Sequence, residues 1–188
     1  MIWYIMIWFS ADYHLSHKNI IHYCNRPFKT VKEMDNEILV NLFRSMGSGD
    51  TLYYLGDLTF KIPIAKSFFA SIQNSDIKIH YIIGNHDKPE VIELARLNCD
   101  SVSNLKDIKL EEKPITLCHY AMRVWNKSHF NSWQLYGHSH GALAPIGKQY
   151  DVGVDNNEFK PVSFEDLKII MENLPNNFNY IENVQNRQ

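Results

Sequence analysis

The chain has few cysteines, almost no net charge and no long hydrophobic run, and each shortage narrows the classes of protein it can belong to. Its three cysteines are an odd number without a C-x-x-C spacing, which argues for reduced thiols in a cytoplasmic compartment. The formal net charge of -2 supplies no general field that would hold a polyanion such as long DNA, although a local basic patch is compatible with it.

The longest apolar stretch opens the chain, over residues 1–9, and Asp12 follows it closely. A membrane span needs about 20 residues, and a signal peptide would need a basic start and a small-residue cleavage site. We therefore expect a β-strand here and no membrane association. Met6 is a second candidate start, because a strand from Met6 to Ala11 would suffice.

Short apolar runs alternate with helical patterns along the rest of the chain, without a linker or a repeat. The 188 residues suit one domain, over residues 1–175, with a polar, Asn-rich tail over 176–188 that we expect to fray. Strands are predicted at Met6–Phe9, Thr51–Leu55, Ile79–Ile83, Lys106–Leu110, Ile115–Cys118, Trp133–Tyr136 and Tyr150–Val154. Helices are predicted after Thr30, which begins a capping box, and at Pro63–Ile72, Pro89–Leu97 and Ser163–Met171. This alternation predicts a layered α/β fold.

Five polar fragments follow these apolar runs, at the strand ends where α/β proteins place their chemistry. They are Asp12-Tyr13-His14, Gly56-Asp57, Gly84-Asn85-His86-Asp87, His119 and Gly137-His138-Ser139-His140. Each fragment alone has a plain structural explanation: a solvated loop pair, a helix cap, a polar turn before a helix, a structural histidine and a surface histidine pair. In the fragment Gly84-Asn85-His86-Asp87, we expect Asp87 to orient the His86 ring or to raise its pKa.

Together the fragments supply enough ligands for two metal ions. Residues two apart point the same way from an extended or loop backbone, so Asp12 and His14 can grip one cation, as can His138 and His140. A mixture of Asp, Asn and His without Cys suits divalent Mn, Fe, Ni, Co or Zn, of which we favour Mn.

This ordered set resembles the calcineurin-like metallophosphoesterase superfamily, whose pattern is D-x-H, G-D, G-N-H-D/E, a lone H and G-H-x-H. The flanking segments at 17–21, 25–28, 152–155 and 160–164 look like its compact bacterial, archaeal and phage branch. The resemblance implies a four-layer αββα sandwich with a dinuclear metal site at its loop-bearing edge. It also implies that one metal is held by Asp12, His14 and His140, the other by Asn85, His119 and His138, with Asp57 between them. His86 and Asp87 would then be catalytic, with His86 as a general acid.

The resulting hypothesis is a metal-dependent phosphoesterase in which a hydroxide between the two metals attacks phosphorus. A small or nucleotide-like phosphodiester is the favoured substrate. The alternatives are a phosphomonoesterase, a nuclease, and a non-catalytic protein-binding scaffold. Candidate substrate-binding residues are Arg26, Arg123, His17 and Asn19; each arginine suits either a phosphate or a surface salt bridge. Trp125 and Trp133 could stack on a ring, but core packing is favoured for both. The oligomeric state is open.

Overall fold

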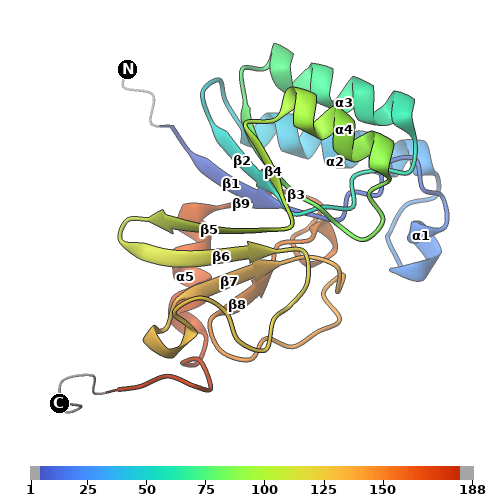
Figure 1. The fold of residues 1–188 in the computed structure, drawn as a ribbon. Helices are drawn as coiled ribbons and strands as arrows, with labels where there is room; N and C mark the ends of the chain where they lie inside the picture. The colour runs from blue at the N-terminus through green and yellow to red at the C-terminus, as the bar shows by residue number, and fades with distance from the viewer. Residues whose placement is uncertain (1–4, 183–188) are drawn as a thin grey trace.

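Two β-sheets pack against each other in the computed structural model, which describes residues 5–182 (Figure 1). The first sheet has the order β4 (Ser101–Ser103), β3 (Lys78–Ile82), β2 (Thr51–Tyr54), β1 (Ile7–Ser10) and β9 (Val162–Ser163). Strands β1 to β4 are parallel, and β9 is antiparallel to β1. The second sheet has the order β5 (Leu105–Leu110), β6 (Lys113–Cys118), β7 (Trp133–Tyr136) and β8 (Gln149–Asp151). Here β6, β7 and β8 are parallel and β5 is antiparallel to β6.

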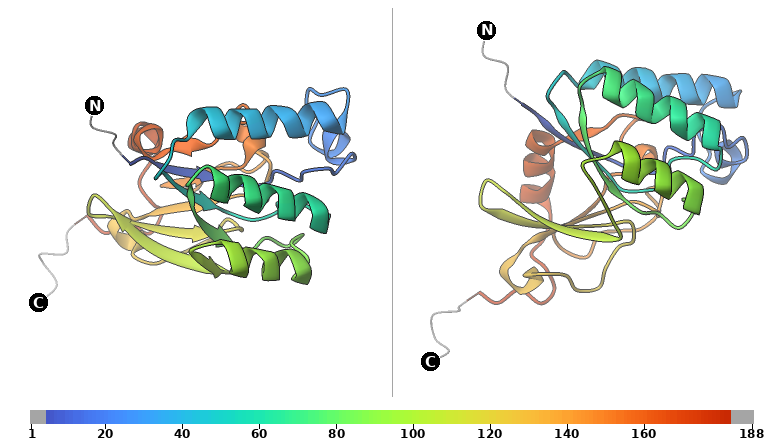
Figure 2. Two further views of the ribbon diagram at one scale, coloured as in Figure 1. Left: turned by 90° about the horizontal axis from the view of Figure 1, so that it is seen from above. Right: turned by 45° about the horizontal axis from the view of Figure 1, so that its top comes forward.

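Three helices cover the outer face of the first sheet (Figures 1 and 2). They are α2 (Val31–Ser45), α3 (Ile62–Asn74) and α4 (Pro89–Asn98). The predicted capping residue Thr30 is confirmed, since its hydroxyl accepts the backbone N–H of Glu33 at 3.1 Å. Ser163 caps α5 (Phe164–Asn173) in the same way, accepting the N–H of Asp166 at 3.0 Å.

The alternation of side chains along β2 divides the interior into two cores. Leu52 and Tyr54 pack with the three helices. Tyr53 and the following Leu55 point the other way and pack with residues of the second sheet. Because both faces of this strand are buried, its sequence is a continuous apolar run, as expected for a central parallel strand. Trp125 and Trp133 are 7% and 5% exposed, which confirms the core packing favoured for them.

The predicted sandwich is confirmed, but its fourth, helical layer is not found among residues 5–182. Helix α5 packs on β1 and β9, and its buried side chains enter the core between the sheets. The outer face of the second sheet carries the buried glutamines Gln134 and Gln149. Both bond to the backbone of Met122, in the segment after β6. Polar side chains on this face fit a covering loop, whose backbone needs partners, rather than an apolar helix face.

The predicted helices and longer strands are all present, with ends shifted by up to a few residues. Three short elements were not predicted, namely β4, β9 and the helix α1 (Ile20–Tyr23). The prediction of a strand at the N-terminus is met from Ile7 onward, and residues 1–4 lie outside the described residues. Within the described part, no helix has the length and apolar character needed to cross a membrane.

The start of the polar tail is packed, contrary to our expectation of fraying. Asn177 is 2% exposed and donates to the backbone carbonyls of Ser128 and Ser132 at 2.8 and 2.9 Å. Its own side-chain oxygen accepts the N–H of Lys148 at 2.7 Å. The boundary at residue 175 stays a prediction.

Candidate functional site

The loops that follow β1, β2 and β7 meet at the α1 end of the molecule (Figure 1). The loop after β1 continues the parallel pairing beyond the strand: Asp12 N–H donates to Gly56 O and His14 N–H to Asp57 O, both at 3.0 Å. The chain after β6 joins the chain after β7 through Gly137 N–H and His119 O at 3.0 Å. The backbone therefore brings segments distant in sequence to one place before any metal is considered.

Five of the seven predicted ligand residues have left-handed backbone conformations. They are Asp12 (φ 61°), His14 (φ 48°), Asp57 (φ 62°), His138 (φ 66°) and His140 (φ 47°). Asp and His tolerate this region better than most residues, yet each such conformation carries some strain. Between the first two, Tyr13 points into the helical core and is 1% exposed. The alternation thus sends Asp12 and His14 to the site, as predicted.

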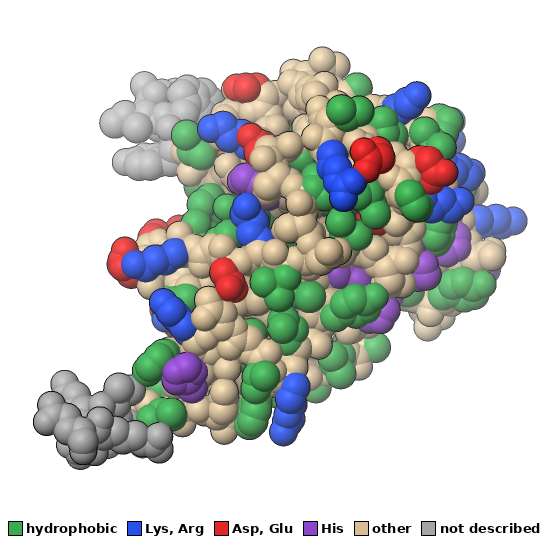
Figure 3. Space-filling model, in the orientation of Figure 1, with side chains coloured by type: hydrophobic (Ala, Val, Ile, Leu, Met, Phe, Trp, Pro, Cys, Tyr) green, Lys and Arg blue, Asp and Glu red, His purple; other side chains and the backbone are tan. Residues whose placement is uncertain are grey.

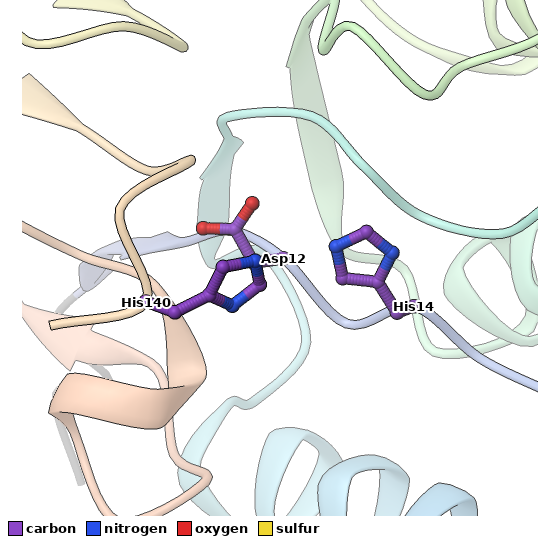
Figure 4. Close-up of side chains that lie close together, drawn as sticks. All are labelled: Asp12, His14 and His140. Atoms are coloured by element: carbon purple, nitrogen blue, oxygen red, sulfur yellow. The ribbon is translucent and has the colours of Figure 1, made fainter. Parts of the chain in front are cut away.

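The first cluster consists of Asp12, His14 and His140, with one ligand atom of each within 4.8 Å of the others (Figure 4). Asp12 Oδ2 accepts the N–H of His138 at 2.9 Å. Asp12 Oδ1 and His14 Nε2 are buried and have no hydrogen-bond partner. A buried polar atom without a partner is costly, so these two donor atoms fit direct contact with a metal ion.

Two glycines make room for the carboxylate of Asp12. A Cβ on Gly137 would lie 2.6 Å from Asp12 Oδ2, and a Cβ on Gly153 would lie 2.7 Å from it. Only bare backbone fits on these two sides, and this explains the glycine that begins the G-H-x-H fragment.

The second cluster is centred on Asn85. Its Oδ1 lies 2.9 Å from His119 Nε2 and 2.8 Å from His138 Nδ1. His119 donates through Nδ1 to the carbonyl of Leu55 at 2.6 Å, so Nε2 is the nitrogen that faces Asn85 and Asp57. A backbone carbonyl on the far nitrogen is the usual support of a metal-binding histidine.

Asp57 lies between the two clusters. Its Oδ2 is 3.6 Å from His14 Nε2 and 3.5 Å from His119 Nε2, so one oxygen faces a histidine of each predicted set. Its other oxygen accepts the backbone N–H of His86 at 2.8 Å. The structure therefore brings together all seven predicted ligand residues.

Gly56 and Gly84 allow the loops around Asp57 to touch. A Cβ on Gly84 would lie 2.2 Å from Asp57 Oδ1, and a Cβ on Gly56 would lie 2.4 Å from the nitrogen of Gly84. Gly56 also has φ +90°, which other residues rarely adopt. The glycines of the G-D and G-N-H-D fragments thus serve the same close contact.

The electrostatics of the site favour added positive charge. Burial raises the pKa of Asp12 to about 7 and lowers the pKa of His14 to about 3. Burial also disfavours charge on His140, but its hydrogen bond to Asp155 outweighs this and raises its pKa to about 10. Without a cation, a carboxylate here binds a proton in its place.

Asp155 is a site residue that our sequence analysis did not single out. Its Oδ2 accepts Nδ1–H of His140 at 2.7 Å and also Nη2 of Arg26 at 2.7 Å, while Oδ1 accepts Nε of Arg26 at 2.7 Å. Its only signal in the sequence was its membership of the flanking segment 152–155.

The position of Arg26 corrects its predicted role as a phosphate anchor. Its side chain is buried, and its remaining donors reach the carbonyls of Asp12 at 2.7 Å and Tyr13 at 3.0 Å and the sulfur of Met34 at 3.3 Å. With these contacts and the Asp155 fork, no N–H group is left for a phosphate. Arg26 instead ties the Asp12–His14 loop to Asp155.

Asp87 also differs from prediction, since it does not orient the His86 ring. Its two oxygens accept four hydrogen bonds, at 2.8–3.1 Å, from the backbone N–H groups of Asp57, Leu58 and Gly84 and from the hydroxyl of Tyr81. This carboxylate holds the Asp57 loop against the Gly84 turn. The side chains of His86 and Asp87 therefore point in different directions, which could not be read from the sequence of this fragment alone.

The exposed residues of the site form its mouth, where histidines gather near hydrophobic and basic side chains (Figure 3). The exposed His86 lies with its ring 5.7 Å from that of His14 and 5.4 Å from that of Phe60. The ring of His17, which is half-buried, lies 5.6 Å from the His14 ring, so His17 borders the site; its predicted role in substrate binding stays a prediction.

The other two predicted substrate-binding residues have no contact with the clusters. Asn19 is exposed at the start of α1 and its side chain caps nothing. Arg123 is exposed and stacks over the ring of Phe178 at 4.3 Å. Their predicted roles gain no support from these positions.

The site residues could hold metal ions. Hard carboxylate and amide oxygens are mixed with imidazoles, two buried donor atoms lack partners, and His119 and His140 each have their second nitrogen fixed by an acceptor.

Comparison with known proteins agrees with the fold but assigns no activity. No protein-family model matches the chain. It is 28% identical over 173 residues to the uncharacterized protein MJ1445 of Methanocaldococcus jannaschii, a match that covers 88% of this chain and 91% of that protein. The solved structure of the protein of unknown function AQ665 from Aquifex aeolicus superposes with a TM-score of 0.70 at 24% identity, covering 89% of this chain and 100% of that one. A structure described as a novel archaeal phosphodiesterase superposes with a TM-score of only 0.45 at 16% identity, over 79% of this chain and 82% of that one, too distant for an argument.

Proposed function

We propose that the chain is a metal-dependent phosphoesterase that holds two divalent cations, with Mn²⁺ favoured, and prefers phosphodiesters. The main support for this proposal is the position of Asp57, whose Oδ2 lies 3.6 Å from Nε2 of His14 and 3.5 Å from Nε2 of His119. A carboxylate shared between two ligand sets is the arrangement that a two-metal site needs. The order of the sequence fragments, which resembles the calcineurin-like superfamily, supports the same function.

In this proposal, Asp12, His14 and His140 hold one cation and Asn85, His119 and His138 hold the other. When bound, the two cations would activate water and offset negative charge on the phosphoryl oxygens. Arg26 and Asp155 would keep His140 oriented through its Nδ1–H. Asp87 would keep the Asp57 loop in place through its hydrogen bonds to backbone N–H groups.

His86 is the proposed general acid. Its backbone N–H is fixed on Asp57 while its ring is exposed at the mouth, where it can reach a leaving oxygen. The ring makes no hydrogen bond within residues 5–182, so its protons remain available to a substrate. General acids of this kind contribute about 10²–10⁴-fold to the rate.

The experiment compares bis(p-nitrophenyl) phosphate with p-nitrophenyl phosphate, after metal stripping and add-back of Mn²⁺, Ni²⁺, Zn²⁺ or Mg²⁺. We expect that added metal restores cleavage and that the enzyme cleaves bis(p-nitrophenyl) phosphate faster than p-nitrophenyl phosphate. The His86→Ala variant should lose about 10²–10⁴-fold in kcat with its metal content unchanged. Preference for the monoester would make the enzyme a phosphatase. Equal loss of metal and activity in the variant would overturn the acid role, and no cleavage with any metal would favour a scaffold.

A further inference from the structure

Two exposed tyrosines border the proposed metal site. Tyr23 is 72% exposed, and its ring lies 6.2 Å from that of His17, which in turn lies 5.6 Å from the His14 ring. Tyr120 is 47% exposed, and its ring lies 4.8 Å from that of His138 and 5.2 Å from that of His119. One tyrosine therefore borders each of the two ligand sets.

The side chains between the tyrosines form one continuous row. His14 and His119 both face Asp57 Oδ2. The series of contacts therefore runs from Tyr23 through the two clusters, with Asp57 between them, to Tyr120. Among residues 5–182, neither tyrosine hydroxyl has a hydrogen-bond partner. Large exposed aromatic rings whose hydroxyls are not tied to the protein are suited to stacking on a flat ligand.

Two lysines add positive charge beside this row. Lys61 and Lys88 immediately precede α3 and α4, so their charges add to the positive ends of two helix dipoles. Lys61 donates to Ser16 Oγ at 3.0 Å, and Lys88 Nζ lies 5.9 Å from the centre of the Phe60 ring, beside His86. Within the described residues, neither has a carboxylate within 4.0 Å. The combination of unpaired lysines and exposed rings matches an anionic ligand that carries flat rings.

We infer that Tyr23 and Tyr120 are two stacking positions on either side of the reacting phosphate, and that the substrate is a phosphodiester with a base on each ester arm, such as a dinucleotide unit of single-stranded nucleic acid. This inference rests on the proposed function and deepens it. A phosphate at the metals would direct its two arms toward opposite ends of the row. The small net charge is no obstacle, because a short strand needs only the local lysines and the metals.

The test uses two diesters with the same leaving group, methyl p-nitrophenyl phosphate and thymidine 5′-p-nitrophenyl phosphate, on the Mn²⁺-loaded enzyme. Both release p-nitrophenol, but only the second has a ring on its remaining arm. Wild type should prefer the thymidine ester, mainly through a lower KM. One of the two variants Tyr23→Ala and Tyr120→Ala should abolish this preference. Its kcat/KM for the thymidine ester should fall by roughly 5- to 150-fold, which is the effect of losing one stacked base. The other should weaken cleavage of both esters, because both share the p-nitrophenyl ring.

Controls separate stacking from structural damage. Tyr23→Phe and Tyr120→Phe keep the ring and should retain the preference for the thymidine ester. The Mn²⁺ content of every variant is measured because Tyr120 contacts His138. Equal cleavage of both esters by wild type, with no effect of either alanine variant, would overturn the stacking inference and leave the phosphodiesterase intact. Failure to cleave either ester with any metal would defeat the proposed function itself. To identify the ligand's length, dinucleotides and longer single strands are compared as competitors; weaker inhibition by both than by inorganic phosphate would also overturn the inference.

Discussion

Asp155 accepts the Nδ1–H of His140 at 2.7 Å, and this contact fixes which nitrogen of the histidine faces Asp12. The same carboxylate forms a two-pronged pair with Arg26 at 2.7 Å for each bond. A carboxylate behind a histidine typically orients a metal ligand and increases its basicity. Asp155 thus joins His140, 15 positions away in sequence, to Arg26, 129 positions away, and the three side chains support the site together.

Removal of the charge on Asp155 should weaken metal binding without abolishing the fold. Asp155→Asn keeps the size of the side chain but loses the charged acceptor, and we expect the dissociation constant for Mn²⁺ to rise about 10- to 100-fold. Isothermal titration measures it. Glu158→Gln, an exposed change in the same segment, is the matched control and should bind as wild type. Equal affinity in Asp155→Asn and the control would show that His140 does not need this support.

Arg26→Lys should behave as a structural rather than a substrate-binding variant. A lysine keeps the charge but cannot make the two-pronged pair and both carbonyl contacts. We expect the free energy of unfolding to fall by at least about 2 kcal/mol, because hydrogen bonds to a charged group are lost from a buried site. At saturating metal, KM for bis(p-nitrophenyl) phosphate should be unchanged. A higher KM at unchanged stability would restore the original prediction that Arg26 binds phosphate.

The metal-free protein should lose stability as pH rises, because of Asp12. Burial raises the pKa of this carboxyl from 3.8 to about 7 in the folded state, so folding retains a proton that the unfolded chain releases. The resulting stability is fully present below pH 3.8 and is lost as pH rises toward 7, up to about 4 kcal/mol for this group. In Asp12→Asn this dependence is absent.

Urea unfolding in EDTA at pH 5 and pH 8 measures the effect. From pH 5 to pH 8, the free energy of unfolding of Asp12→Asn should rise relative to that of wild type. The other titrating groups are the same in both proteins, so their contributions largely cancel when the two free energies are subtracted. If the difference between the two proteins is the same at both pH values, Asp12 does not carry a raised pKa.

Gly84→Ala should disrupt the site by displacing Asp57. The new Cβ would lie 2.2 Å from Asp57 Oδ1 and 2.5 Å from its backbone nitrogen, so the loop must move. We expect loss of Mn²⁺ binding and a destabilisation of about 1–3 kcal/mol, the usual effect of overpacking. Gly47→Ala is the control, because nothing lies within 4 Å of its new Cβ. Normal metal binding by Gly84→Ala would mean that the contact between these loops is not needed.

The ligand residues could be predicted from sequence because their information is local. Each fragment follows a buried strand, and carboxyl ends of neighbouring parallel strands meet at one edge. The alternation of Tyr13 with its neighbours likewise follows from backbone geometry alone. For the same reason, the longer strands and helices could be predicted, whereas the sandwich was expected only from the family resemblance.

The supporting residues could not be predicted because their roles depend on distant partners. A guanidinium fits a phosphate and a carboxylate equally well, and only the fold brings Asp155 to Arg26. Asp87 is adjacent to His86 in the chain, yet its bonds go to the Asp57 loop. The helix at Phe164–Asn173 was predicted, but its place against β1 and β9 depends on which faces the rest of the chain leaves open.

The most direct test of the account is the number of Mn²⁺ ions bound per chain, measured by elemental analysis after metal stripping, reloading and gel filtration. We predict two ions in wild type and at most one in Asp57→Ala, since Asp57 faces both histidine sets. No bound metal in wild type, or two ions in the variant, would contradict it.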